Sequence, residues 1–338
     1  MLWYLLALPF VLLGLYVVRK HVIAPSKKKL EQEIYGGELA RPIREHGGLR
    51  HETMAWDGVG RSEDGKATLS YFRTGPDEGG EGERPTLVFL HPTPHTLLSF
   101  VGTWFGDEGL ARDHEVLALE VLGHGVARPD VGLIGFQDCA DWVSAALRHL
   151  GVEDAILIGQ SYGGEVAWRA ALDSIERVRS VVLMDSSGLA RREGDWLPEE
   201  KAMRSMKLAT IGWMLNSRDR VEGALALHYE TQPPHQEQVT AVARTCDNPS
   251  NWRAMVGLCR DENGERFEEL ADLDRPTLLL WGELDKAYEP SHYGEAFLQK
   301  LPDAELELVP GSGHYPQEEK PALVARAIRA FVARRLAN

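Results

Sequence analysis

The stretch A-I-L-I-G-Q-S-Y-G-G, residues 155–164, decides how the rest of the chain is organised. Its first four residues are apolar and β-prone, which predicts a buried strand, and the amphipathic residues after it predict a helix. The pattern G-x-S-x-G between them is typical of a sharp strand-to-helix turn that holds a serine in a strained conformation. Gly159 and Gly163 would leave room where the two backbones approach. We expect the Ser161 hydroxyl to lie above the sheet, at a helix N-terminus that favours negative charge.

Strands and helices alternate on both sides of this turn. Short β-prone segments are separated by helical patterns, such as residues 136–150, and an amphipathic helix over residues 321–336 closes the chain. This alternation predicts a parallel sheet covered on both faces. Residues 190–268 interrupt it with mostly helical character, so we expect them to be an insertion between two strands of one sheet. The predicted strands cover residues 50–59, 66–74, 85–90, 116–121, 155–158, 181–184, 275–282 and 304–309.

Residues 1–18 are almost wholly apolar and carry no charged side chain. At about 1.5 Å per residue, a helix of this length spans about 27 Å, close to the hydrocarbon thickness of a bilayer. Basic residues follow the segment and do not precede it, which favours a retained membrane anchor over a cleaved signal peptide. The positive-inside rule then predicts that the following domain, residues 49–338, faces the cytoplasm. We expect residues 19–48 to be a juxtamembrane connector.

Charge and cysteine content narrow the partners that this chain can have. The formal net charge of −14 argues against nucleic acid, whose phosphates an acidic surface repels. Cys139, Cys246 and Cys259 have the spacing of neither a zinc site nor a disulfide framework, and an odd number fits a reducing compartment. We therefore expect no metal and no cofactor. Nothing in the sequence indicates the oligomeric state.

A serine hydroxyl is a poor nucleophile at neutral pH, so Ser161 needs a base that is oriented by an acid. Asp285 directly follows the strand predicted over residues 275–282, and His314 directly follows that over residues 304–309. Both would emerge at the carboxyl edge of the sheet, where Ser161 also lies. We predict that these three residues form a Ser-His-Asp triad.

Acyl transfer also needs an oxyanion hole, which two backbone N–H groups usually form. Tyr162, the residue after the serine, is the first predicted donor. The second should come from the loop H-P-T-P-H at residues 91–95. Because prolines have no N–H, Thr93 is the only amide donor between Pro92 and Pro94.

The segments H-P-T-P, G-H-G, G-Q-S-Y-G-G, W-G-E-L-D and P-G-S-G-H, in this order, resemble the α/β-hydrolase superfamily. More narrowly, they are similar to its esterase, lipase and carbon–carbon-bond hydrolase branch, from about residue 50 to the C-terminus. The resemblance implies a mostly parallel eight-stranded sheet flanked by helices, with residues 190–268 as a helical cap after the sixth strand. Two positions depart from the family pattern: Pro92 stands where glycine is usual, and Leu122 replaces a proline.

Two other acidic residues are rivals of Asp285 as the acid of the triad. Asp185 also follows a strand end, where the family sometimes carries its acid, and Glu283 lies two residues nearer the strand than Asp285. Asp285 is preferred because W-G-E-L-D matches the family pattern and Asp185 leads into the insertion.

Ser161 at the elbow argues against two members of this superfamily, the epoxide hydrolases and the haloalkane dehalogenases, which carry an aspartate there. The resemblance implies hydrolysis of a carboxylic ester through an acyl-enzyme on Ser161. A Met- and Trp-rich cap beside a membrane anchor favours an apolar or lipid-like ester. Carbon–carbon-bond hydrolysis, acyl transfer and perhydrolysis use the same triad and stay open as alternatives. A catalytically silent binding protein is the least favoured reading.

Overall fold

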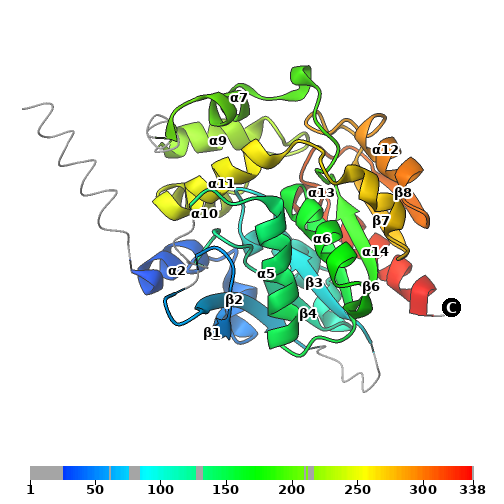
Figure 1. The fold of residues 1–338 in the computed structure, drawn as a ribbon, viewed down its shortest axis with the longest axis horizontal. Helices are drawn as coiled ribbons and strands as arrows, with labels where there is room; N and C mark the ends of the chain where they lie inside the picture. Colours follow the sequence, from blue (N-terminus) through cyan, green and yellow to red (C-terminus); the bar gives the residue numbers. More distant parts are fainter. Residues whose placement is uncertain are drawn as a thin grey trace, which may run out of the picture.

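An eight-stranded sheet forms the centre of the molecule (Figure 1). The structure is a computed structural model, and it describes residues 26–60, 62–75, 84–126, 132–208, 211 and 217–336. The strands are β1 (Arg50–Ala55), β2 (Lys66–Thr74), β3 (Thr86–Leu90), β4 (Val116–Leu119), β5 (Ala155–Gln160), β6 (Val178–Met184), β7 (Thr277–Gly282) and β8 (Ala304–Val309). Their order is β1-β2-β4-β3-β5-β6-β7-β8. β1 and β4 run antiparallel to β2, and all other neighbours are parallel.

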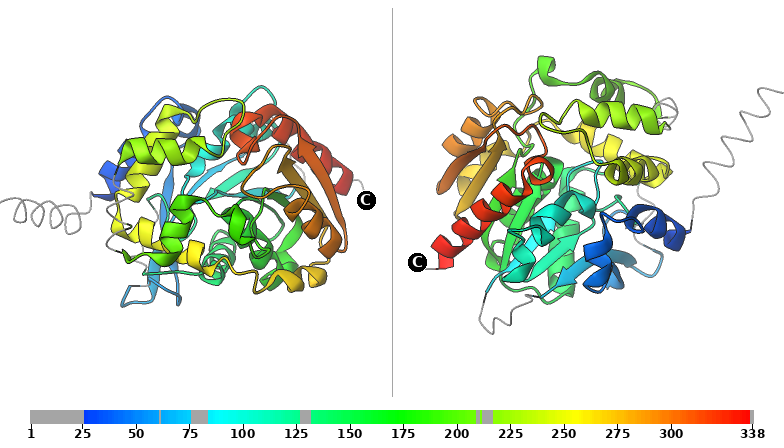
Figure 2. Two further views of the ribbon diagram at one scale, coloured as in Figure 1. Left: turned by 90° about the horizontal axis from the view of Figure 1, so that it is seen from above. Right: turned by 180° about the vertical axis from the view of Figure 1, so that it is seen from behind.

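Helices cover both faces of this sheet. Along β5, Leu157 packs into the core under α5 (Phe136–His149), α6 (Tyr162–Asp173) and α12 (Tyr293–Lys300). Its neighbours Ile156 and Ile158 pack into the opposite core, under α4 (Val101–Phe105) and α14 (Pro321–Leu336). The rear view shows α14 in front of the sheet (Figure 2). Because both faces are buried, the central strands are continuously apolar, as the sequence predicts for parallel strands.

The cap lies between β6 and β7, as predicted for residues 190–268. It has an apolar core of its own, to which Ile211, Trp252 and Met255 belong. Trp252 and Met255 show that part of the Met- and Trp-rich composition of the cap serves packing within the cap. Its described helices are α7 (Pro198–Ser205), α9 (Arg218–Ala226), α10 (Gln236–Cys246) and α11 (Pro249–Asp261).

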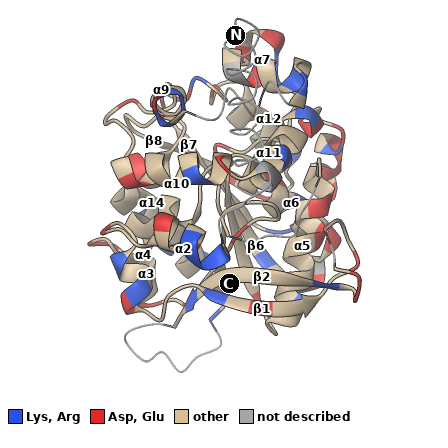
Figure 3. Ribbon diagram, turned by 90° about the vertical axis from the view of Figure 1, so that its left-hand side faces the viewer, with Lys and Arg blue, Asp and Glu red and all other residues tan. Residues whose placement is uncertain are grey.

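Residues 19–48 were expected to be a juxtamembrane connector, and the described part of this segment is helical. This part forms α2 (Lys27–Tyr35) and α3 (Arg41–Glu45), and α2 packs against α10 of the cap (Figure 3). Leu30 and Ile34 are buried one helical turn apart, a spacing that signals an amphipathic helix. The Tyr35 hydroxyl donates a hydrogen bond of 2.6 Å to the buried Glu120, which ties the segment to the central domain.

No helix in the described part of the chain has the length and hydrophobicity needed to cross a bilayer. The anchor predicted over residues 1–18 lies outside the described residues.

Candidate active site

The turn between β5 and α6 has the strained geometry that its sequence predicts. Ser161 has φ 54° and ψ −122°, a backbone conformation that residues other than glycine rarely adopt. A Cβ on Gly159 would lie 2.1 Å from the carbonyl oxygen of Gly163. A Cβ on Gly163 would lie 2.3 Å from the carbonyl oxygen of Leu90. The two glycines therefore allow the helix to start directly against the sheet with the serine at its tip.

We expect Gly163→Ala to lower the free energy of unfolding by at least about 2 kcal/mol, because backbone atoms of β3 cannot move away as a flexible side chain could. Chemical denaturation at neutral pH measures this loss. Gly194→Ala is the matched control, since a Cβ there meets nothing within 4 Å. Equal stability of the two variants would contradict the tight approach described here.

The structure brings together the three residues that the sequence predicts as a triad. His314 Nε2 lies 3.0 Å from Ser161 Oγ, and His314 Nδ1 lies 2.8 Å from Asp285 Oδ2. The other Asp285 oxygen accepts the backbone N–H groups of Ala287, at 2.8 Å, and Tyr288, at 3.2 Å. All three triad side chains are buried. The aspartate is therefore held in place while it orients the imidazole toward the serine.

The rival acid Asp185 lies behind this aspartate. Asp185, Asp285 and His314 each place one polar atom within 4.8 Å of the others. Asp185 Oδ1 accepts the Gly282 N–H at 2.8 Å. Burial and the neighbouring Asp285 charge raise the pKa of Asp185 well above its usual range. Two carboxyl groups this close do not both ionise, so Asp185 holds the proton of the pair.

Asp285 is the ionised member of this pair. Burial acts to raise its pKa, but the charge and hydrogen bond of His314, with the hydrogen bond from Asp185, lower it below its usual value. Glu283, the other rival, is exposed and accepts the Gly311 N–H at 2.9 Å. The geometry therefore favours Asp285 as the partner of His314.

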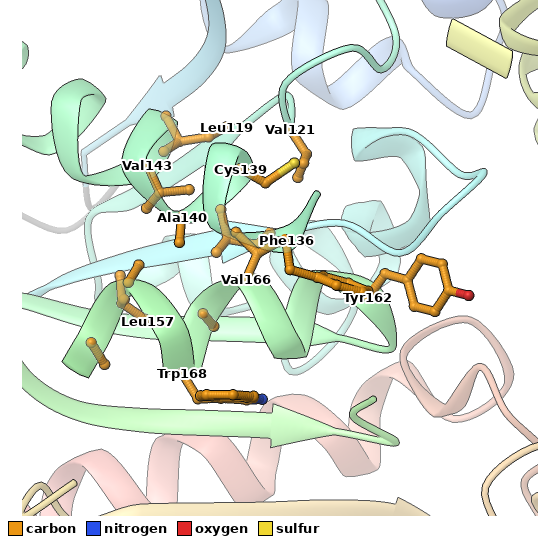
Figure 4. Packing of buried hydrophobic residues seen from close by; sticks show 14 of the residues in the cluster. Leu119, Val121, Phe136, Cys139, Ala140, Val143, Leu157, Tyr162, Val166 and Trp168 are labelled. Atoms are coloured by element: carbon orange, nitrogen blue, oxygen red, sulfur yellow. The ribbon is translucent and has the colours of Figure 1, made fainter. Parts of the chain in front are cut away.

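The two predicted oxyanion donors line the same cavity as Ser161. Tyr162 is the first residue of α6, where helical N–H groups have no partner within the helix. Its ring packs against Phe136, with the hydroxyl directed away from the core cluster (Figure 4). That hydroxyl donates a hydrogen bond of 2.7 Å to Glu262, which fixes the side chain.

Two histidines hold the loop that carries Thr93. His124 Nε2 lies 2.9 Å from Thr93 Oγ1, and His91 Nε2 accepts the N–H of Val121 at 3.1 Å. Burial lowers the pKa of His91 to about 3 and that of His124 to about 4, so both are neutral at pH 7. His91 directly follows β3 and His124 lies in the loop after β4, and these contacts hold the Thr93 loop in place.

A cavity of about 390 Å³ lies between the triad and the cap. This volume is within the range of small-molecule sites, and its walls are mainly apolar. The cap supplies most of the apolar wall, which includes Leu197, Met203, Ile211, Val221, Leu225, Val242 and Met255. The cap therefore covers the serine with a surface suited to hydrocarbon.

Three aromatic residues around His314 were missed by the sequence reasoning. The ring centres of Tyr288, Tyr315 and His228 lie 5.3, 5.0 and 5.3 Å from that of His314. The backbone carbonyl oxygen of His228 also accepts a hydrogen bond of 2.9 Å from the backbone N–H of His314. Tyr315 adjoins the predicted histidine in sequence, which was an available signal. His228 comes from the cap, and no local pattern points to it.

The sheet topology, the serine elbow and the Ser161–His314–Asp285 hydrogen bonds define the chain as an α/β protein of the hydrolase class. It belongs to the alpha/beta hydrolase family, whose model matches residues 87–327. The fold and family expected from the sequence are thus confirmed.

Proteins with several different names are similar to this chain. The uncharacterized hydrolase YugF of Bacillus subtilis strain 168 is 28% identical over 252 residues, which cover 74% of this chain and 90% of YugF. Haloalkane dehalogenase 2 of Mycobacterium tuberculosis strain H37Rv is 26% identical over 268 residues, covering 73% and 88%. The structure of a bacterial membrane phospholipase A, described as a virulence factor, has a TM-score of 0.71 at 21% identity and covers 100% of both chains. The structural match shows the shared fold.

Proposed function

We propose that the chain is a serine hydrolase that cleaves carboxylic esters with an apolar acyl group. The observation that carries this proposal is the continuous hydrogen-bond path from Ser161 through His314 to Asp285 at the floor of an apolar cavity. Haloalkane dehalogenase 2 is a relative, but its family carries an aspartate at the elbow. Ser161 supports acyl transfer in place of attack on a carbon–halogen bond.

The first half-reaction forms the acyl-enzyme. Ser161 Oγ attacks the ester carbonyl while His314 Nε2, at 3.0 Å, takes the hydroxyl proton. The ionised Asp285 stabilises the imidazolium that results, through its hydrogen bond to Nδ1. The N–H groups of Thr93 and Tyr162 would stabilise the oxyanion of the tetrahedral intermediate. His314 then protonates the departing alkoxide, and the alcohol leaves.

The second half-reaction repeats these steps with water. His314 removes a proton from a water molecule, which attacks the acyl carbon. The same two N–H groups stabilise the second oxyanion. Collapse of this intermediate transfers the proton from His314 to Ser161 Oγ and releases the carboxylic acid.

Labelling with a fluorophosphonate probe tests this proposal directly. The probe should attach covalently to Ser161, because only a serine activated by a base reacts rapidly with such reagents. Mass spectrometry of the peptide that contains residues 155–164 would locate the label. A folded full-length chain that remains unlabelled would contradict the assignment.

A series of p-nitrophenyl esters tests the apolar acyl group. We expect kcat/KM to rise with acyl length from acetate to octanoate, since each buried CH₂ contributes about 0.8 kcal/mol. The cavity walls supplied by the cap provide the surface for that burial. A preference for acetate would contradict the proposed substrate class.

We also propose that residues 1–18 anchor the enzyme in a membrane, with the domain on the cytoplasmic side. Support comes from their apolar sequence and from the packing of the nearby α2 against α10 of the cap. An anchor placed there would keep the cap, which covers the cavity, close to the bilayer. The full-length chain should resist alkaline extraction from membranes, whereas a chain starting at residue 26 should be released.

A further inference from the structure

The polar groups around His314 differ in whether they have a partner. The Tyr288 hydroxyl donates a hydrogen bond of 2.5 Å to Glu262, so it is already occupied. Within the described part of the chain, neither the Tyr315 hydroxyl nor the His228 imidazole makes a hydrogen bond. Both side chains line the cavity, and Tyr315 is only 3% exposed. Both groups are therefore available to bond a molecule that enters the cavity.

The reaction places one half of the substrate beside these two rings. His314 must protonate the departing alkoxide, so the alcohol oxygen lies within hydrogen-bond reach of His314 Nε2. The rings of His228 and Tyr315 lie 5.3 and 5.0 Å from the His314 ring and 5.7 Å from each other. Among the described residues, they are therefore polar groups without a hydrogen bond that lie beside the alcohol half of a bound ester.

The chemistry of the pair selects a neutral hydroxyl group. Burial and, to a smaller extent, the charge of the nearby His314 lower the pKa of His228 to about 4, so its ring is uncharged at neutral pH. A neutral imidazole offers one N–H donor and one nitrogen acceptor, and a tyrosine hydroxyl both donates and accepts. A free hydroxyl on the substrate satisfies both kinds of group, whereas a phosphate or carboxylate would meet no positive charge from this pair.

We propose that His228 and Tyr315 form a subsite for a hydroxyl group on the alcohol half of the substrate. The preferred substrates are then esters of a polyol, of which a glycerol monoester is the simplest. This inference rests on the proposed ester hydrolysis and adds the identity of the alcohol. An alcohol half without a hydroxyl would leave the buried Tyr315 and the half-buried His228 without a hydrogen-bond partner in the complex, which lowers transition-state binding.

Two esters with the same acyl chain test the subsite: 1-hexanoylglycerol and propyl hexanoate. Wild-type kcat/KM should favour the glycerol ester by at least about tenfold, the effect of one hydrogen bond of about 1.4 kcal/mol. Tyr315→Phe and His228→Phe should each lower that ratio severalfold while they retain an aromatic ring against His314. A ratio near one in the wild type, or one that neither variant changes, would overturn the subsite.

Tyr229→Phe is the matched control. The ring centres of Tyr229 and Tyr315 lie 5.1 Å apart, so both belong to the same aromatic cluster. The Tyr229 hydroxyl, however, already donates a hydrogen bond to Glu318. The ratio between the two esters should stay at the wild-type value in this variant. Fluorophosphonate labelling of the wild type and of every variant tests ester hydrolysis separately from the subsite. Failure of the wild type to label refutes ester hydrolysis on Ser161. Normal labelling of the wild type without a preference for the glycerol ester refutes the subsite alone.

Discussion

Ser161→Ala should lower kcat for the best ester at least about 10⁴-fold and abolish fluorophosphonate labelling. The alanine removes the only atom that forms the acyl-enzyme, while the cavity and the oxyanion donors remain. KM should change little, because the serine hydroxyl contributes mainly in the transition state. Steady-state kinetics with p-nitrophenyl octanoate measures both constants.

The alanine variant should also stay folded, which separates lost chemistry from lost structure. Among the described residues, the hydroxyl makes one hydrogen bond, to His314, whereas the Ser161 backbone N–H donates to the Met184 carbonyl at 2.9 Å in either variant. Thermal unfolding should therefore show a melting temperature close to that of the wild type. Labelling that persists in Ser161→Ala would show that another residue is the nucleophile.

Asp285→Asn should lower kcat by about 10⁴-fold, although the side chain keeps its shape. The amide cannot accept the Nδ1–H of His314 through its nitrogen and cannot stabilise the imidazolium by charge. The neighbouring Asp185→Asn should retain activity within about tenfold, because an amide N–H can replace the carboxylic O–H that faces Asp285. A positive φ of 44° at position 185 also suits asparagine. Kinetics of both variants decide which carboxyl group acts on the base.

The same pair predicts a pH dependence of stability. In the wild type, the pKa of Asp185 is raised in the folded state, so the folded chain keeps a proton that the unfolded chain releases. This contribution to stability is therefore present at low pH and is lost as the pH rises from the unfolded pKa of about 3.8 toward the folded value. Asparagine does not titrate. The stability of Asp185→Asn relative to the wild type should accordingly increase with pH, and a flat difference between pH 5 and pH 9 would contradict the shared proton.

Much of the fold was predictable because its signals are local. The pattern of β5 and the start of α6 is contained in residues 155–164, and the apolar runs of the other central strands are equally short. Strand direction followed from the alternation of strands and helices. Asp285 and His314 could be proposed because each directly follows a strand, and the carboxyl ends of parallel strands meet at one edge.

The parts that were missed depend on contacts between distant positions. The packing of α2 and the turn after it on the cap joins residues about two hundred positions apart, such as Leu39 of that turn, whose N–H donates to Glu237 at 2.8 Å. The amphipathic pattern of α2 was visible, but its partner was not. Likewise, His228 resembles any cap residue in the sequence until the fold places it beside His314.

The sequence by itself determined the sheet, the elbow that exposes Ser161 and the order of its predicted partners, because each follows from residues adjacent in the chain. The tertiary structure alone decided which of two buried carboxyl groups keeps the proton, since Asp185 and Asp285 come together only when β6 and β7 pair. It also decided which aromatic residues surround His314 and which of their polar groups make no hydrogen bond within the described part of the chain. Distances and burial in the folded chain decide whether two carboxyl groups share a proton and whether a polar group lacks a hydrogen-bond partner. Residues adjacent in the sequence do not set these distances.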